Sequence, residues 1–183
     1  TSSVNSAIPS AAGALPFNRE IEFKQVTFAY PTRADAPVFE DLSLRIKAGA
    51  TTAIVGPSGS GKSTLIGLLL GFYSPNMGEI LVDSERLTLE NISRFRECIA
   101  LVPQEPQLFA LSIAENLRLG NARATDEQLK DACRKARILD FIESLPDTFE
   151  TEVGERGILL SAGQKQRVAI ARALLRDPKL LIL

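Results

Sequence analysis

Residues 56–64 read Gly56-Pro57-Ser58-Gly59-Ser60-Gly61-Lys62-Ser63-Thr64. Four residues separate Gly56 from the run Gly61-Lys62-Ser63, which is the G-x-x-x-x-G-K-[ST] spacing of a phosphate-binding loop. Glycines let the backbone N–H groups turn toward the α- and β-phosphates, while a lysine in this place reaches the β- and γ-phosphates and the following hydroxyl binds Mg²⁺. The pattern therefore predicts a nucleoside triphosphate site at Gly56, Ser58, Gly59, Ser60, Gly61, Lys62, Ser63 and Thr64.

The residues on either side of this loop support the pattern. Residues 51–55 form a short β-branched run, which predicts a buried strand. Residues 64–70 are mostly apolar and predict a helix, whose positive dipole end would lie at the loop. A strand, a glycine-rich loop and a helix in this order are the context that the motif requires, and a chance glycine-rich turn would lack it.

The composition is that of a globular chain large enough for one domain. Among 183 residues, 45% are hydrophobic and 23% are charged. Lys and Arg number 21 against 22 Asp and Glu, so the charge balance does not indicate nucleic acid as a partner. Residues 65–73, the longest strongly apolar stretch, are too few to cross a bilayer. With no histidine in the chain, histidine acid–base chemistry is excluded within these residues.

The two cysteines and the first residues carry little functional signal. Cys98 and Cys133 are far apart and lack the spacing of metal ligands, so we expect two reduced thiols. Residues 1–19 begin with a stretch rich in Ser, Ala and Pro, which indicates a linker or tail.

From residue 20 onward the chain alternates between strand and helix patterns. Thr125 and Ser161 are each well placed to cap the N-terminus of a helix, and the helix after Ser161 is expected to stop before Pro178. Residues 112–168 are mostly helical in pattern. The predicted strands span residues 20–28, 38–46, 51–55, 79–83, 99–102 and 180–183.

A second motif follows the loop by about a hundred residues. Leu160-Ser161-Ala162-Gly163-Gln164, continued by residues 165–167, resembles the signature sequence of ABC ATPases, in which a second glycine is usual at the position of Ala162. By itself this motif would indicate only a capped helix. Together with the phosphate loop, it makes the chain similar to the nucleotide-binding domain of ABC transporters from about residue 20 to residue 183.

Three further segments fit the same family. Tyr30 resembles the aromatic residue that stacks on adenine, and an electron-rich ring suits a flat base. Gln104 resembles the glutamine that senses Mg²⁺ and water and whose loop faces the membrane domains. Residues 151–157 resemble the loop of exporters that contacts their coupling helices. The likeness is greatest to type B exporters, the branch of multidrug and peptide exporters that includes half-transporters.

The resemblance implies an α/β fold: a P-loop NTPase core with an N-terminal antiparallel β subdomain and an inserted α-helical subdomain, at about residues 105–175, that carries the signature. It implies ATP and Mg²⁺ as cofactors, with Ser63 and Gln104 at the metal and Gln104 as the catalytic residue within the chain. The expected partners are a second nucleotide-binding domain, which would present Ser161, Ala162, Gly163 and Gln164 to ATP in trans, and transmembrane domains. These would hold the domain at a membrane, on its cytosolic or matrix-like side.

The chain departs from the family pattern at two places. The family has an Asp for Mg²⁺ and a Glu for water directly after the strand that ends at Leu183, and a histidine further on, so all three fall outside these residues. We therefore expect a fragment of a longer ATPase that binds nucleotide and hydrolyses little. Ala162 leaves two alternatives: a normal site, or one of the degenerate sites of heterodimeric exporters.

Other functions fit the sequence less well. A soluble ABC protein acting on DNA or ribosomes would be expected to show heptads or basic clusters. A small-molecule kinase or GTPase with the same loop would not account for the signature, Tyr30 or Gln104. A non-catalytic ATP-binding fragment that competes for a full-length partner remains an alternative.

Overall fold

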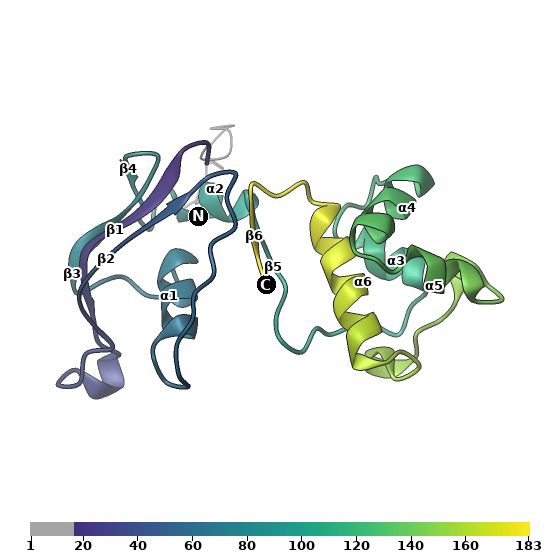
Figure 1. Cartoon of the computed structure of the whole chain (residues 1–183), viewed down its shortest axis with the longest axis horizontal. Helices are drawn as coiled ribbons and strands as arrows, with labels where there is room; N and C mark the ends of the chain where they lie inside the picture. Colours follow the sequence, from purple (N-terminus) through teal and green to yellow (C-terminus); the bar gives the residue numbers. More distant parts are fainter. Residues whose placement is uncertain (1–16) are drawn as a thin grey trace, which may run out of the picture. The chain divides into compact units, whose positions relative to one another are not determined.

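The computed structural model describes residues 17–183 and divides into two compact units, of which the first ends at Cys98 and the second runs from Ile99 to Leu183. The first unit holds an antiparallel sheet and the helix that follows the phosphate loop, and the second holds a helical bundle with a small parallel sheet (Figure 1). The tail predicted for residues 1–19 lies mostly outside the described residues.

The sheet of the first unit has the strand order β2-β1-β3-β4 and is antiparallel throughout. Its strands are β1 (Glu20–Phe28), β2 (Phe39–Lys47), β3 (Met77–Val82) and β4 (Glu85–Arg86). These bounds confirm the antiparallel N-terminal subdomain and match three predicted strands to within two residues.

Strand β1 carries the apolar face of this sheet. Ile21, Phe23, Val26 and Phe28 are all nearly inaccessible to solvent, although the spacing between Phe23 and Val26 breaks the period of two. The register shifts at this point, and Gln25 adopts a left-handed φ of 50°. This irregularity is a β-bulge, whose extra residue returns the following side chains to the buried face.

The turn between β3 and β4 is hydrogen-bonded to the start of β1. Asp83 and Ser84 both have positive φ, as a two-residue hairpin turn requires. The Asp83 carboxylate accepts hydrogen bonds from the backbone N–H groups of Asn18, Arg19 and Glu20 at 2.7–2.9 Å. These bonds hold residues 18–20, at the start of β1, against the turn between β3 and β4.

Two helices complete the first unit: α1 (Lys62–Leu69) and α2 (Ile92–Glu97). At the end of α1, Gly71 takes a left-handed φ of 66°, its N–H donates to Leu68 O, and the N–H of Phe72 donates to Gly67 O. This pair of bonds is a Schellman motif, which reverses the chain after a helix. Arg96 of α2 donates to Leu70 O and Gly71 O, so the carbonyls of the two residues after α1 are satisfied.

The strand predicted for residues 51–55 is not formed, and this prediction was wrong. The segment joins no sheet, and its residues are exposed, with Val55 88% accessible. A buried strand takes its hydrogen bonds from neighbours on both sides. None of the described strands pairs with residues 51–55, so the neighbours that a buried strand needs are missing.

The second unit is mainly helical. It contains α3 (Ile113–Arg118), α4 (Asp126–Lys135), α5 (Leu139–Ser144) and α6 (Ala162–Leu174), together with the parallel pair β5 (Ile99–Leu101) and β6 (Leu180–Ile182). Short 3₁₀ turns lie at Thr148–Glu150 and Glu155–Gly157 in this unit, and at Pro31–Arg33 in the first unit. Helix α6 ends four residues before Pro178, as its sequence predicted.

Capping boxes begin three of these helices. Ser112, Thr125 and Ser161 each accept a hydrogen bond from the backbone N–H three residues later, and the side chain at that later position bonds back to the cap. The predicted caps at Thr125 and Ser161 are thus confirmed. Each box satisfies two N–H groups that a helix terminus otherwise leaves unpaired.

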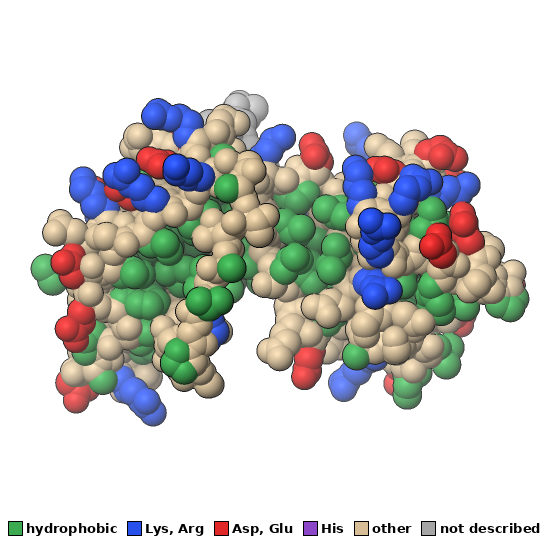
Figure 2. Space-filling model, in the orientation of Figure 1, with side chains coloured by type: hydrophobic (Ala, Val, Ile, Leu, Met, Phe, Trp, Pro, Cys, Tyr) green, Lys and Arg blue, Asp and Glu red, His purple; other side chains and the backbone are tan. Residues whose placement is uncertain are grey.

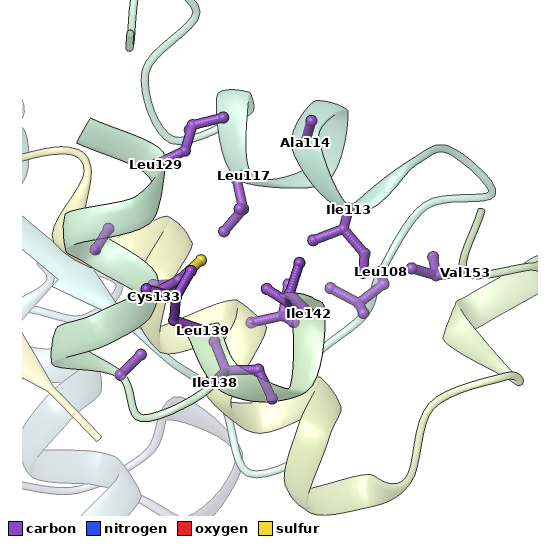
Figure 3. Packing of buried hydrophobic residues seen from close by; sticks show 14 of the residues in the cluster. Leu108, Ile113, Ala114, Leu117, Leu129, Cys133, Ile138, Leu139, Ile142 and Val153 are labelled. Carbon is purple, nitrogen blue, oxygen red and sulfur yellow. The ribbon is translucent and has the colours of Figure 1, made fainter. Parts of the chain in front are cut away.

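The core of the second unit lies among α3, α4, α5 and α6. Leu117, Leu129, Ile142 and Val168 are at most 2% exposed, and Figure 3 shows side chains of α3, α4 and α5 converging on this region. Cys133 lies in the same core as a buried thiol, and its burial raises its pKa to about 12. The signature helix α6 is therefore held by the largest hydrophobic cluster of the unit.

Candidate nucleotide-binding site

The phosphate loop lies in the first unit, between the exposed residues 51–55 and helix α1. Gly59 and Gly61 adopt φ values of +83° and +91°, a region that favours glycine. At Gly61, an added Cβ would stand 2.7 Å from the Phe39 ring and 2.8 Å from Val38 Cγ1. The loop thus needs glycine here for its conformation and for the close approach of β2 and the residue before it.

The ammonium group of Lys62 closes the loop. Its Nζ donates to Gly56 O at 2.8 Å, to Pro57 O at 2.7 Å and more weakly to Ser60 Oγ at 3.4 Å. These bonds bring the first residues of the loop next to the first residue of α1. The positive charge therefore lies inside the loop, in the place where the motif requires it for phosphate oxygens.

Ser63 and Thr64 follow on the first turn of α1. The Ser63 side chain is exposed, so its hydroxyl is accessible to a cation, while Thr64 is only 5% exposed. The helix N-terminus adds a positive partial charge and unpaired N–H groups. This donor set fits a magnesium-bound triphosphate, and the assignment of Ser63 to the metal remains a prediction.

Tyr30 is linked to this turn by a hydrogen bond. Its hydroxyl lies 2.8 Å from Thr64 Oγ1, and its ring packs edgewise on Phe28 and Tyr73, with centroids 5.1 Å away in both cases. The predicted base-stacking residue is thus brought beside the phosphate loop. Sequence reasoning missed Tyr73, because the residue falls at the end of an apolar run that indicated only helix core.

The other predicted site residues belong to the second unit. Gln104 is exposed in the loop after β5. Ser161 is the N-cap of α6, while Ala162 and Gly163 form its exposed first positions. The Gln164 side chain bonds back to the Ser161 N–H at 2.8 Å and thereby completes the cap. The roles of these residues toward a nucleotide stay predictions.

The first turn of α6 has open space at Gly163, where an added Cβ would meet nothing within 4 Å. The segment before it is more constrained. Gly154 and Gly157 have positive φ, and the Val153 side chain is fully buried against the core of the second unit.

Neither a metal cluster nor a membrane span emerges between residues 17 and 183. No group of three or more His, Cys, Asp or Glu side chains in that range could hold an ion. None of the helices described there combines the length and hydrophobicity needed to span a bilayer.

The order of the elements and the phosphate loop agree with a known family. The family model described as ABC transporter matches residues 39–183, which covers most of the chain and both sequence motifs. The chain belongs to the ABC transporter family. Its fold is that of the ABC ATPases, as the sequence predicted, and residues 39–183 correspond to the ATP-binding domain.

Curated relatives of this ABC domain include members of the B family. The chain is 51% identical over 163 residues to ABC transporter B family member 2 of Dictyostelium discoideum, and 48% identical over 176 residues to ATP-binding cassette sub-family B member 5 of Mus musculus. These matches cover 89% and 95% of the chain but only 12% and 14% of the relatives. The chain thus spans about an eighth of the length of these proteins.

A solved structure supports the same placement. A bacterial Atm1-family ABC exporter, determined with ATP bound, has a TM-score of 0.84 to this ABC domain and is 42% identical to it. The match covers 96% of this chain and 30% of the exporter chain. The likeness confirms the predicted family and the exporter branch, and it adds a relative in which ATP is present.

Proposed function

We propose that this ABC domain binds MgATP on the loop of residues 56–64 and uses the bound nucleotide to associate with a second such domain in an exporter. The observation that carries the proposal is the closed loop itself. Lys62 Nζ lies within 2.8 Å of the carbonyls of Gly56 and Pro57, at the N-terminus of α1, and Tyr30 is bonded to Thr64 on the same turn. Phosphate and base sites are thereby joined in one unit.

The proposed role of Mg²⁺ is limited to the phosphates. Ser63 and Gln104 would hold the ion, which neutralises phosphate charge when it is bound. Within the chain, the loop N–H groups and Lys62 orient the triphosphate, and Tyr30 offers its ring to the base. Catalysis in this class consists mainly of positioning and charge stabilisation, so these contacts are the domain's own contribution.

A second domain would complete the site through the signature. Ser161 begins α6, a helix of 13 residues whose dipole favours an anion at its N-terminus. The open surroundings of Gly163 would let a partner's γ-phosphate approach this terminus. ATP would then hold two domains together, and their opening would drive transport in the membrane domains.

The proposed contact with transmembrane domains is supported by a hollow in the second unit. The hollow has a volume of about 440 Å³ and lies among residues that follow β5, the end of α3 and the end of α6. Three exposed apolar side chains, Leu101, Phe109 and Leu119, line it, and Figure 2 shows hydrophobic side chains exposed on this unit. Burial lowers the pKa of Arg172, which lines the same hollow. An apolar hollow with a cationic wall suits a short helix of a partner.

We further propose that a polypeptide of these 183 residues binds ATP but hydrolyses little. The family has acidic residues, and further on a histidine, after the strand that corresponds to β6. These residues are not among residues 1–183, which contain no histidine. Sustained release of phosphate from the 183-residue polypeptide, abolished by Lys62→Ala, would overturn this part of the proposal.

The proposed affinity for ATP is tested by titration of the 183-residue chain with MgATP in a calorimeter. The chain is expected to bind, and Lys62→Ala to lose at least about tenfold in affinity, because a charge-assisted contact is removed. Lys47→Ala is the matched control, since Lys47 ends β2, away from the loop. Equal ATP binding by the wild type and Lys62→Ala would contradict the proposed site.

A further inference from the structure

The loop after α1 returns to the base-stacking residue. The Schellman motif at Gly71 and Phe72 reverses the chain, and an edge of the Tyr73 ring then lies close to α1 at Gly67. A Cβ added at Gly67 would stand 3.2 Å from Tyr73 Cδ2, so a side chain on this residue would push the ring away. The absence of a side chain at Gly67 therefore sets how closely Tyr73 approaches the helix of the phosphate loop.

From this place the ring of Tyr73 contacts two other rings. It meets Tyr30 edge-on, at 5.1 Å and an interplanar angle of 89°, and Phe28 at 5.5 Å and 47°. Phe28 and Tyr30 also contact each other, at 5.1 Å and 76°. Each ring of this aromatic triad touches the other two, an arrangement that favours one orientation of the Tyr30 ring.

The same loop also holds the backbone that carries Tyr30. The side-chain oxygen of Asn76 accepts a hydrogen bond from the N–H of Ala29 at 2.7 Å. The N–H of Asn76 donates to Thr27 O at 2.9 Å. These two bonds lie immediately before Tyr30 in the sequence. Ring and backbone of Tyr30 are thus fixed from one short segment, residues 73–76, while its hydroxyl is fixed by Thr64.

We propose that Tyr73 and Asn76 are positioning residues that hold Tyr30 as a platform for the base, and so determine how much of the affinity for ATP comes from the base. The inference rests on the proposed function, because it assumes that a nucleotide binds beside Tyr30. It reaches beyond that function, since neither residue belongs to the phosphate loop. If Tyr73 and Asn76 are positioning residues, replacing either one lowers the affinity that the base contributes and leaves the affinity for triphosphate unchanged. A substitution that damages the structure in general lowers both affinities.

The test compares two ligands on the 183-residue chain: ATP and inorganic tripolyphosphate, each with Mg²⁺. Tyr73→Leu removes the ring, and Tyr73→Phe keeps it. Asn76→Leu removes the acceptor for the Ala29 N–H, and Asn76→Asp keeps one. Base stacking on an aromatic side chain is worth about 1–3 kcal/mol, so the ATP-to-tripolyphosphate affinity ratio is expected to fall about tenfold in both leucine variants. Tripolyphosphate affinity is expected to stay at the wild-type value, and Tyr73→Phe and Asn76→Asp to restore the ratio.

Three other outcomes would overturn part of the account. Equal losses for both ligands, or an unchanged ratio, would overturn the positioning role while leaving the proposed function intact. A wild-type chain that binds tripolyphosphate as tightly as ATP would show that the base contributes nothing, and would overturn the platform at Tyr30. A wild-type chain that binds neither ligand would overturn the proposed function itself. Should Tyr73→Leu fail to fold, the Asn76 pair decides the question.

Discussion

Replacing Gly61 by alanine perturbs the phosphate loop in two ways at once. The residue has a φ of +91°, so alanine would be held in the left-handed region. Its new Cβ would also stand 2.7 Å from Phe39 Cε1 and Cζ, where carbon atoms normally keep about 3.5–4.0 Å apart. Both effects act in the first unit, and they can be separated by a second glycine of the same loop.

The expected magnitudes follow from these two effects. The left-handed conformation costs an alanine about 1–2 kcal/mol, and crowding a packed site costs about 1–3 kcal/mol more. Gly59 has a φ of +83° but nothing within 4 Å of its added Cβ, so Gly59→Ala is expected to cost the first amount alone. Gly163→Ala on α6 has neither strain nor crowding and is expected to leave stability unchanged or raise it.

The assay is equilibrium unfolding in urea, followed by two signals. The chain has two tyrosines and no tryptophan, and both Tyr30 and Tyr73 lie in the first unit, so tyrosine fluorescence reports on the unit that holds the loop. Far-ultraviolet circular dichroism reports mainly on the helices of the second unit. The fluorescence transition is expected to shift most for Gly61→Ala, less for Gly59→Ala and not at all for Gly163→Ala. Equal shifts for the two loop variants would show that the contact with Phe39 costs nothing and would refute the reasoning.

Three further predictions concern the rest of the chain. Cys133, whose pKa is raised to about 12 by burial, is expected to resist alkylation at neutral pH until urea unfolds the second unit; rapid labelling of folded chain at Cys133, located by peptide mass, would contradict its burial. Burial raises the pKa of Asp83, but the N–H groups of residues 18–20 outweigh it, and the pKa is lowered from 3.8. Its stabilising contribution is therefore complete above pH 3.8 and is lost as the pH falls through the folded pKa, so the wild type is expected to lose its stability advantage over Asp83→Asn on acidification in urea melts. Ser161→Ala removes the cap of α6 and is expected to destabilise the second unit by about 1 kcal/mol, whereas Ser161→Asp, which keeps an acceptor, is expected to be close to wild type in the dichroism transition.

Much of this architecture could be predicted because it depends on local chemistry. The caps at Thr125 and Ser161 need only a hydroxyl and a Gln three residues later, and both formed as the spacing indicated. The alternating apolar residues of β1 predicted its buried face, although not the bulge at Gln25. The loop of residues 56–64 was recognisable because each of its positions serves a phosphate or a turn.

The rest depends on contacts between distant residues, which no short pattern contains. The sequence of residues 51–55 reads as a buried strand, but a strand also needs partners, and the described sheets supply none beside it. Tyr73 and Asn76 contact residues more than 40 positions away, at Tyr30 and Ala29. These contacts depend on where the turn after α1 places residues 73–76, which the local sequence does not specify.

The measurement that tests the account most directly is an amide-resolved NMR titration of the 183-residue chain with MgATP. The account predicts that the largest and earliest changes occur at the N–H groups of Gly59, Gly61 and Lys62, with smaller changes at Tyr30 and its neighbours. Tripolyphosphate should reproduce the changes at the loop but not those around Tyr30. A titration whose largest changes fall outside residues 56–64, or in which the loop amides do not respond, would contradict the assignment of this loop as the nucleotide site.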